Sequence, residues 1–325
     1  MADIVDTIMI GAGPSALAAA VYTTREDIST TLYEKGVIGG LAAITDMVDN
    51  YPGFPDGIEG LKLAGYLEKQ AERFGAKIEY GDVSSLTVDE NNIKTVIVDG
   101  SPVQARTVLI ATGSDYVKLG IPGEQELYGR GVHYCATCDG AFYREKRLVV
   151  VGGGNSAVQE AIFLTRFTTH IDLLVRSTIK ASEVLQQDLQ KFVDEGKITV
   201  HLGVIPTEIV AEEGKVTHVN AKKGTEELRF DTDGTFIFVG LMPNTQFLKG
   251  SGVELDEQGL IKTDNHLETN ISGVFASGDV RSGATMQIAS AVGEGATAAL
   301  SIREYIDELH HVESSPLAAA ELNAA

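Results

Sequence analysis

Asp6-Thr-Ile-Met-Ile-Gly-Ala-Gly-Pro-Ser-Ala16, followed directly by Leu17-Ala-Ala-Ala-Val-Tyr22, is the stretch that decides the fold. The apolar run that ends at Ile10 predicts a buried strand, and the run after Ala16 predicts a helix. Between them, Gly11, Gly13 and Ala16 fit the GxGxxG/A spacing. The first glycine makes the turn, the second lets a pyrophosphate approach the backbone, and the third small residue lets the helix pack closely on the strand. The amino end of such a helix offers free N–H groups and a positive dipole end to phosphates.

A carboxylate follows at the position that a dinucleotide site needs. Thr30–Tyr33 predicts a second strand, and Glu34 ends it, about 20 residues after the glycine turn as the fingerprint requires. A carboxylate there can accept hydrogen bonds from both ribose hydroxyls. A lone glycine motif could be an ordinary turn, but here the strand, the helix and the acid all occur in the expected order.

The same pattern occurs a second time. Arg147–Val151 predicts a strand, Gly152-Gly-Gly-Asn-Ser-Ala157 a glycine turn, Val158–Phe167 a helix and Ile171–Val175 a further strand. Two copies predict two nucleotide-binding domains. This second strand is not followed by an acid but by Arg176 and Lys180, which could hold a ribose 2′-phosphate, as in NADP sites. The alternative is that these are two solvated surface charges.

The rest of the chain predicts further elements of a mixed α/β protein. Between the two glycine turns we expect a Gly- and Pro-rich loop at 36–60, a helix, a small mixed sheet and a return to the main sheet. The last third predicts one strand, a helix and a frayed tail from Glu313. The helices are Leu61–Phe74 and Gln287–Leu309, and the strands are Lys77–Tyr80, Val83–Val88, Ile93–Val98, Thr107–Ile110 and Thr235–Val239.

The composition and net charge of the chain exclude some classes of binding partner. The 325 residues carry a net charge of −20, which would repel phosphate backbones and anionic membranes, so we expect no nucleic-acid or membrane partner. No run of about 18 apolar residues occurs, and the acidic start lacks the basic region of a signal peptide, so a cytoplasmic location is expected. Glycine is abundant, with 35 residues, as expected where backbone approaches a ligand closely.

The two cysteines form a CxxC pair, Cys135-Ala-Thr-Cys138, followed by Asp139. In a reducing compartment such a pair is more often redox-active than structural. A helix beginning there would lower one thiol pKa through its dipole, and Asp139 is a candidate proton donor or acceptor for a departing thiolate. The alternatives are a structural pair or half of a zinc site shared between chains, and we expect no metal. His133 could tune a thiol, but a partly exposed loop histidine is the preferred interpretation.

These motifs together resemble the low-molecular-weight thioredoxin reductases over about residues 4–310. CATCDG followed shortly by GGGNSA is very specific, whereas any one glycine motif is not. The matching segments are Gly11-Ala-Gly-Pro-Ser-Ala16, Asp49-Asn-Tyr-Pro-Gly53, Ala111-Thr-Gly113, Tyr134-Cys-Ala-Thr-Cys-Asp-Gly140, Gly152-Gly-Gly-Asn-Ser-Ala157, Pro243-Asn-Thr245 and Ala276-Ser-Gly-Asp279.

The resemblance implies an α/β protein with two Rossmann-like domains of three-layer ββα type, the second inserted into the first. Residues 1–116 and 245–312 would form a discontinuous FAD domain, 117–244 an NAD(P) domain carrying the CxxC, and 313–325 a disordered tail. The FAD site implied by motif and family comprises Gly11, Gly13, Ala16, Glu34, Gly40, Leu41, Asn50, Val83, Ala111, Gly113, Asp279, Gln287 and Ile288. The nicotinamide-nucleotide site comprises Gly152, Gly154, Asn155, Ser156, Arg176 and Lys180.

The resemblance also implies a homodimeric enzyme that passes electrons from NADPH through FAD to the Cys135–Cys138 disulfide and on to a thioredoxin-like protein. Cys138 would lie next to the flavin, Cys135 would attack the partner's disulfide, and Asp139 would handle protons. The inserted domain would swing about its hinge to present the nicotinamide and the disulfide in turn.

Two departures from the family pattern leave alternatives open. Leu41 stands where Gly-Gly-Gln is usual, which removes a side-chain contact with the flavin. The 2′-phosphate signature His-Arg-Arg-x-x-x-Arg-Ala becomes Leu174-Val-Arg-Ser-Thr-Ile-Lys-Ala181, so a bidentate clamp becomes a weaker contact. NADH or reduced ferredoxin are therefore alternative donors. An FAD-dependent dithiol oxidase and a non-enzymatic redox-sensing flavoprotein are the rival functions.

Overall fold

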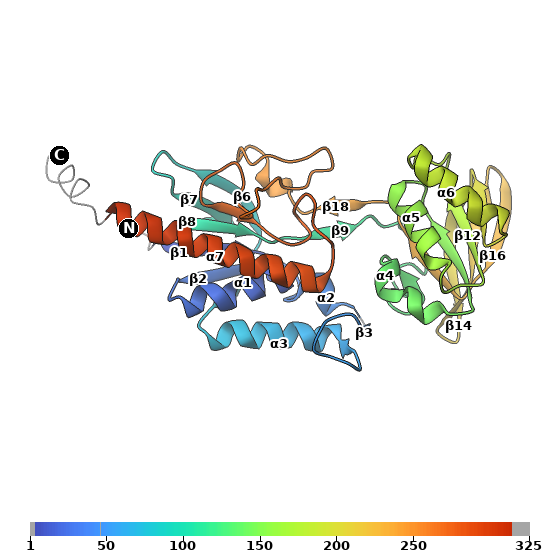
Figure 1. Cartoon of the computed structure of the whole chain (residues 1–325), viewed down its shortest axis with the longest axis horizontal. Helices are drawn as coiled ribbons and strands as arrows, with labels where there is room; N and C mark the ends of the chain where they lie inside the picture. The colour runs from blue at the N-terminus through green and yellow to red at the C-terminus, as the bar shows by residue number, and fades with distance from the viewer. Residues whose placement is uncertain (1–3, 46, 314–325) are drawn as a thin grey trace. The chain divides into compact units, whose positions relative to one another are not determined.

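The computed structural model describes residues 4–45 and 47–313, which form two compact units. One unit combines the chain up to Asp115 with the chain from Met242, and the other is Tyr116–Leu241. The two connecting segments, β9 (Ser114–Tyr116) and β18 (Leu241–Pro243), pair with each other (Figure 1). The second unit is therefore an insertion into the first.

The first unit is built on one seven-stranded sheet in the order β5–β2–β1–β8–β7–β6, with β19 also paired to β8. Its strands are β1 (Val5–Ile10), β2 (Thr30–Glu34), β5 (Lys77–Tyr80), β6 (Val83–Val88), β7 (Lys94–Val98), β8 (Ser101–Ile110) and β19 (Val274–Ala276). The expected separate small sheet is wrong. Strand β8 is long enough for its first half to pair antiparallel with β7 while its second half pairs parallel with β1 and β19, so one sheet results.

Alternating side chains divide the core of this unit between the two faces of the sheet. Met9, Leu32 and Leu109 pack under the helices, whereas Ile8 and Val108 face the opposite side. The helices are α1 (Pro14–Arg25), α3 (Gly60–Arg73) and α7 (Ile288–Glu313), and α1 and α7 lie side by side (Figure 1). The expected loop at 36–60 contains α2 (Gly40–Ala43), β3 (Met47–Val48) and β4 (Ile58–Glu59).

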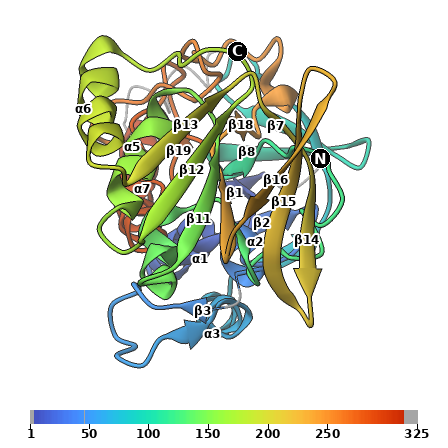
Figure 2. The ribbon, with the colours of Figure 1, turned by 90° about the vertical axis from the view of Figure 1, so that its right-hand side faces the viewer.

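The second unit repeats the plan with a five-stranded parallel sheet in the order β10–β17–β11–β12–β13. Leu148 and Val150 face the helices α5 and α6, whereas Val149 and Val151 face a three-stranded antiparallel sheet, β14–β15–β16 (Figure 2). The elements are β10 (Val132–His133), α4 (Ala136–Asp139), the 3-10 helix η1 (Gly140–Tyr143), β11 (Arg147–Val151), α5 (Asn155–Leu164), β12 (His170–Val175), α6 (Glu183–Asp194), β13 (Ile198–Leu202), β14 (Ile205–Glu212), β15 (Lys215–Lys223), β16 (Glu226–Asp231) and β17 (Gly234–Ile237). A second 3-10 helix, η2 (Gln246–Leu248), belongs to the first unit.

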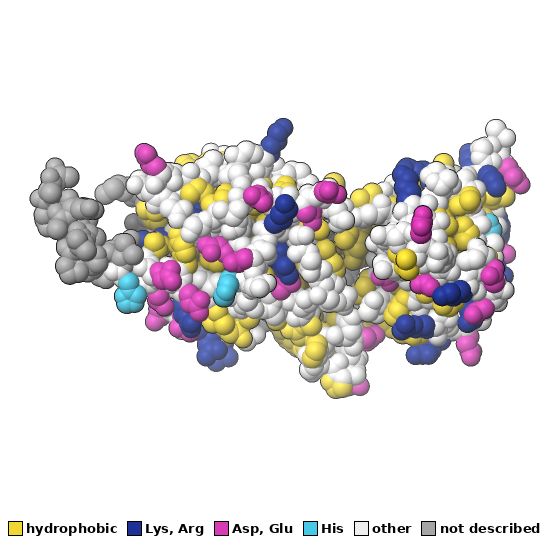
Figure 3. All heavy atoms as spheres, turned by 45° about the horizontal axis from the view of Figure 1, so that its top comes forward, with side chains coloured by type: hydrophobic (Ala, Val, Ile, Leu, Met, Phe, Trp, Pro, Cys, Tyr) yellow, Lys and Arg dark blue, Asp and Glu magenta, His cyan; other side chains and the backbone are white. Residues whose placement is uncertain are grey.

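The predicted α/β class with parallel sheets is confirmed, and most predicted elements lie within three residues of the observed ones. The predicted tail, 313–325, lies outside the described residues except for Glu313, the last residue of α7. Among the described residues, no helix has the length and apolar character that crossing a membrane requires. On the face drawn in Figure 3, Lys and Arg side chains are interspersed with Asp and Glu.

Candidate functional site

The two glycines of the first glycine turn, Gly11 and Gly13, have different surroundings. Gly11 follows β1 with φ +96, and a Cβ there would come within 2.6 Å of the Ala111 carbonyl oxygen, so only glycine fits. Gly13 caps α1 in an ordinary extended conformation, and a Cβ there would meet no atom of the chain within 4 Å. The space beside Gly13 is thus left open in a cavity rather than filled by the protein.

That cavity has a volume of about 310 Å³ and lies entirely in the first unit. It gathers ten of the thirteen residues predicted for FAD. These are Gly11, Gly13, Glu34, Gly40, Leu41, Ala111, Gly113, Asp279, Gln287 and Ile288. A second cavity of about 360 Å³ adjoins it and shares Gly11 and Glu34 with it, and Val83 lines this second cavity. The two cavities thus meet at the glycine turn and at Glu34.

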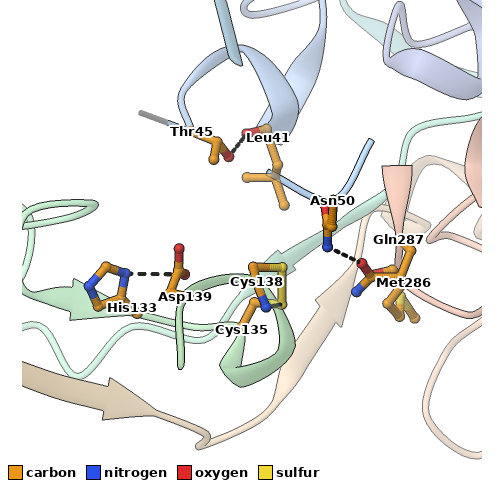
Figure 4. Close-up of a disulfide and its surroundings, with 9 residues drawn as sticks. All are labelled: Leu41, Thr45, Asn50, His133, Cys135, Cys138, Asp139, Met286 and Gln287. Atoms are coloured by element: carbon orange, nitrogen blue, oxygen red, sulfur yellow. Dashed lines mark hydrogen bonds and ion pairs between the residues drawn. A yellow bond between two sulfur atoms is a disulfide. The ribbon is translucent and has the colours of Figure 1, made fainter. Parts of the chain in front are cut away.

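The remaining two predicted residues have different positions. Asn50 donates a hydrogen bond from its amide to Gln287 Oε1 at 3.0 Å, which ties it to the rim of the first cavity (Figure 4). Ala16 lines neither cavity and is fully buried in the core between α1 and the sheet. Its small side chain permits the close packing of α1, the role expected of the third position of the glycine motif.

Glu34 is held at the boundary of the two cavities by backbone donors. Its Oε2 accepts from the Ala12 N–H at 2.8 Å and its Oε1 from the Gly36 N–H at 2.7 Å. Each carboxylate oxygen keeps further lone pairs for hydroxyl donors. The side chain is therefore fixed and still able to accept hydrogen bonds from a ribose.

At the other end of the first cavity, Asp279 is held beside an ion pair that the sequence did not reveal. Burial, and then the charge of Glu294, raise the pKa of Asp279 to about 6. Glu294 accepts from the Gly278 N–H at 2.8 Å and from Arg281 at 2.7 Å, which fixes the turn that carries Asp279. Arg281 and Glu294 are 13 positions apart on a turn and a helix, so no local pattern marked them.

Leu41 gives the cavity an apolar side chain where the family pattern has glutamine. Leu41 lines the cavity at the start of α2. Met286 has φ +57, an uncommon conformation for a non-glycine residue, and its carbonyl accepts from Gln287 Nε2 at 2.9 Å. Figure 4 shows Met286 next to Gln287, which accepts the hydrogen bond from Asn50.

The CxxC pair forms a disulfide in the second unit. Cys135 is the residue before the short helix α4 and is bonded to Cys138. The Cys138 N–H donates to Cys135 Sγ at 3.2 Å, and the Asp139 N–H donates to the Cys135 carbonyl at 3.2 Å. In the reduced protein the same N–H can hydrogen-bond a Cys135 thiolate, and a hydrogen bond to the charged form lowers a pKa. Cys135 is thus suited to be the attacking thiolate.

His133 is not the partly exposed loop residue that the sequence suggested. It lies in β10 and is 5% exposed. Its Nδ1 is 3.1 Å from Asp139 Oδ2, and its Nε2 is 2.8 Å from the Tyr143 hydroxyl. The strand and η1 bring these three side chains together, which spacing alone could not show. Among the described residues, no group of His, Cys, Asp and Glu could hold a metal ion.

The second glycine turn has an open surface. A Cβ at Gly152 would approach the Phe238 carbonyl oxygen within 2.3 Å, whereas one at Gly154 would meet nothing within 4 Å. Gly154, Asn155 and Ser156 are exposed at the start of α5. The Asn155 side chain is engaged by the protein itself, since its Oδ1 accepts from the Ser182 N–H at 2.9 Å. Arg176 and Lys180 are exposed just after β12.

Comparison with known proteins gives a consistent family. The family model described as pyridine nucleotide-disulphide oxidoreductase matches residues 5–295. The thioredoxin reductase of Bacillus subtilis (strain 168) is 43% identical over 310 residues, which cover 94% of this chain and 96% of the relative. That of Listeria innocua is 42% identical over 310 residues, covering 94% and 95%.

Solved structures agree with the sequence relatives. The crystal structure of thioredoxin reductase from Streptococcus pyogenes MGAS5005 is 37% identical, covers 94% of this chain and 99% of its own, and superposes with a TM-score of 0.88. The family match over residues 5–295 spans both units and includes both glycine turns and the cysteine pair. The chain therefore belongs to the pyridine nucleotide-disulphide oxidoreductase family, among its thioredoxin reductases.

Proposed function

We propose that this chain is a flavoprotein disulfide reductase that takes electrons from NADPH and passes them, through FAD and the Cys135–Cys138 pair, to a thioredoxin-like protein. The observation that carries the proposal is the disulfide itself. It lies at the start of α4, in the same unit as the second glycine turn, with an acid directly after it. A structural disulfide needs neither the adjoining acid nor the nucleotide motif.

The residues of the first unit fit FAD. Gly13 and Gly113 leave space where a Cβ would meet no protein atom, Glu34 offers a fixed carboxylate, and the two adjoining cavities suit an extended dinucleotide. When bound, FAD would supply two-electron chemistry between the donor and the disulfide. In this proposal residues 1–116 and 245–312 form the FAD domain and residues 117–244 the NAD(P) domain, and the domains alternate by a swing about β9 and β18.

The cysteines carry out the exchange with the protein substrate. The Cys135 thiolate attacks one sulfur of the partner's disulfide, so that a mixed disulfide forms and one partner thiolate departs. The Cys138 thiolate then attacks Cys135 Sγ, the Cys135–Cys138 disulfide forms again, and the second partner thiolate departs. Asp139 adjoins Cys138 and would exchange protons with the departing and attacking sulfurs, so that the partner leaves as a dithiol.

The donor depends on Arg176 and Lys180. Both are exposed where a ribose 2′-phosphate would lie if α5 received the pyrophosphate, which supports NADPH. One arginine and one lysine make a weaker site than an arginine cluster, because lysine acts as a point charge. NADH and reduced ferredoxin are the alternative donors.

A cytoplasmic homodimer is the proposed working form. Tyr22 on α1, and Leu61 and Tyr66 on α3, are 43%, 68% and 48% exposed. Large apolar side chains exposed on neighbouring helices support a surface that another copy covers. A net charge of −20 would favour a thioredoxin-like partner with a basic docking patch.

The proposal is tested by anaerobic stopped-flow measurement of flavin absorbance, with NADPH and NADH titrated separately. Bleaching by NADPH, followed by reduction of thioredoxin, is the expected result. Arg176→Met should reduce kcat/KM for NADPH by about tenfold or more, because a charged hydrogen bond is worth roughly 1.5–3 kcal/mol. The same variant should leave kcat/KM for NADH unchanged.

The other outcomes identify the alternatives. Bleaching by NADH alone would assign NADH as the donor. Bleaching by neither nucleotide, with reduction by reduced ferredoxin, would reject the nicotinamide route. Rapid oxygen consumption with a dithiol and no reduction of thioredoxin would overturn the reductase in favour of an oxidase.

A further inference from the structure

A chain of three hydrogen-bonded side chains ends beside the disulfide. The Tyr143 hydroxyl is 2.8 Å from His133 Nε2, and His133 Nδ1 is 3.1 Å from Asp139 Oδ2. Asp139 is the residue after Cys138. Figure 4 shows the His133 ring directed at the Asp139 carboxylate. The three residues come from β10, α4 and η1, so the fold brings them together.

The imidazole is almost fully buried, and the Asp139 carboxylate beside it is more exposed. Its ring stacks on Phe236 with centroids 5.1 Å apart and meets Tyr143 edge-on at 5.4 Å. The His133 side chain is 6% exposed, whereas that of Asp139 is 18% exposed. Both ring nitrogens have polar partners inside the protein.

The partners fix the tautomer of His133. An ionised carboxylate can only accept, so Nδ1 carries the hydrogen and donates to Asp139. In the neutral ring Nε2 then accepts from the Tyr143 hydroxyl. If the ring is protonated, Nε2 donates to the Tyr143 oxygen and the hydroxyl turns away. Burial, then Asp139 and Asp233, raise the pKa of Tyr143, so the phenol keeps its proton throughout.

The charged groups around the imidazole are few. Asp139 faces it directly, and Asp233, from the turn before β17, acts on Tyr143. Lys146 Nζ lies 5.5 Å from the centre of the Tyr143 ring. On α5, which packs against α4, Glu160 is a half-buried acid whose pKa is raised by burial. Of these groups only Lys146 is a cation, and it lies over the Tyr143 ring.

We propose that His133 is a positioning residue for proton transfer at the Cys135–Cys138 pair, and that it holds Asp139 in place and exchanges a proton with it. The proposal rests on the proposed disulfide reductase function. In the reduced protein, His133 holds the proton that the Cys135 thiol gives up, and Asp139 stays a carboxylate. When the partner's first thiolate departs, it receives this proton from His133 through Asp139. When the Cys138 thiol attacks Cys135 Sγ, its proton passes to Asp139 and on to the second departing thiolate, so that the partner leaves as a dithiol.

A second consequence concerns the reactivity of the thiols. A protonated imidazole beside Asp139 offsets the carboxylate charge, and that favours the thiolate over the thiol. Loss of this proton leaves the carboxylate charge unbalanced and disfavours the thiolate. Replacing His133 should therefore change the reactivity of the thiols.

Two variants separate the two contacts of His133. In His133→Asn the side-chain amide nitrogen takes the place of Nδ1, so the hydrogen bond to Asp139 survives but no proton can be stored. In His133→Gln the amide reaches the place of Nε2, so the contact with Tyr143 survives and the one with Asp139 is lost. Tyr143→Phe removes only the hydroxyl. His266→Asn, an exposed histidine of the first unit, is the control.

The experiment is alkylation of the dithiothreitol-reduced holoprotein with iodoacetamide from pH 5 to 10, with Cys135 and Cys138 quantified separately by mass spectrometry. The wild type and His266→Asn should react alike. His133→Asn should react about fivefold or more slowly at pH 6, a modest case of the effect of a neighbouring charge. His133→Gln should also react more slowly and, in thioredoxin turnover, lower kcat with KM unchanged.

One result would overturn the proposal: folded His133→Asn protein, judged by unchanged FAD content and Tm, whose alkylation profile superimposes on that of the wild type. The proposal would also be overturned if all three variants changed the alkylation rate equally and only in proportion to their loss of Tm. That result would mean that His133 serves packing alone. Tyr143→Phe keeps the test usable if the histidine variants do not fold. Because alkylation needs no donor or thioredoxin, failure of the proposed function would appear separately, as absence of turnover in the wild type.

Discussion

Gly11 and Gly13 are two residues apart, and the structure predicts opposite consequences for replacing them. In Gly13→Ala the new Cβ enters open space in the cavity, and φ −75 suits alanine, so the fold should persist. FAD would lose the close approach to the backbone, and we expect its affinity to fall at least about tenfold, or 1.4 kcal/mol. Titration of the apoprotein with FAD, followed by fluorescence, measures this.

The controls distinguish a binding defect from a folding defect. Gly65→Ala, in α3 where a Cβ meets nothing, should bind FAD normally. Gly11→Ala should fail to fold, because its Cβ would lie 2.6 Å from the Ala111 oxygen at φ +96. Normal FAD affinity in Gly13→Ala would show that the cofactor does not lie against this turn.

Lys94 is a buried cation that makes the free energy of unfolding of the first unit vary with pH in the alkaline range. Its side chain is fully buried, and Nζ donates to the Asn92 carbonyl at 2.9 Å. Burial lowers its pKa from 10.5 to about 8, against the opposing influence of Glu268 and Asp89. Between these values the unfolded chain binds more protons than the folded one, so the free energy of unfolding rises with pH through this window, by up to about 3 kcal/mol from this group.

Lys94→Met should remove that rise and raise stability at pH 7. Urea unfolding of the wild type and the variant at pH 7 and pH 10 measures the difference between them. Lys77→Met, at an exposed position of β5, should behave as the wild type does. If the free energy of unfolding changed with pH equally in the wild type and in Lys94→Met, burial of the charged Lys94 ammonium would not destabilise the fold.

The sequence predicted those site residues that belong to local motifs. Gly11, Gly13 and Glu34 follow from one strand–turn–helix–strand pattern, and the cysteine pair from its own spacing. The contacts of His133 with Asp139 and of Glu294 with Arg281 join separate elements, so no periodicity marks them. The position of His133 in a strand does not follow from the sequence, because a single polar residue near a CxxC pair carries no sign of burial.

At the scale of elements, the second unit shows where pattern reasoning failed. Helix α6 and strands β13–β16 were not predicted, although α6 places Leu185, Leu189 and Phe192 on one face. The hairpin between β14 and β15 has a two-residue turn, Glu213-Gly214, with both φ values positive, a turn that often joins paired strands. Many charged residues along these strands face solvent, so the alternation of apolar and polar residues that predicts a strand is weak.

The contact between α1 and α7 depends on one glycine. A Cβ at Gly295 would lie 2.1 Å from the Ser15 carbonyl oxygen and 3.2 Å from the Ala19 nitrogen, so α7 must lack a side chain there. Gly295→Ala should force the helices apart and lower the free energy of unfolding by about 1–3 kcal/mol, as overpacking does. Thermal unfolding of the holoprotein measures the loss.

Gly293, two residues earlier on the same helix, is the matched control. It is exposed and its Cβ would meet nothing within 4 Å, so Gly293→Ala should gain up to about 1 kcal/mol from helix propensity. Equal effects of the two substitutions would mean that the close crossing of α1 and α7 is not a constraint. This pair tests packing without touching the cavity residues.

At the scale of the whole molecule, the chain is two units with separate cores, and the proposal places FAD in one of them. A ligand stabilises the unit that binds it, by about 4 kcal/mol when its concentration is 1,000 times Kd. Hydrogen exchange of apo- and holoprotein should therefore differ in β1, β2 and α1. Amides of β11–β13 should exchange at the same rate in both.

The position of the exchange boundary is the decisive feature of this measurement. The first unit contains both ends of the chain, so protection by FAD should appear before Asp115, disappear through Tyr116–Leu241, and return after Met242. Such a discontinuous pattern cannot arise from fraying at one terminus. Protection gained in the second unit instead, around Gly152 and α5, would place FAD at the other glycine turn and contradict the proposed division of labour between the two nucleotide motifs.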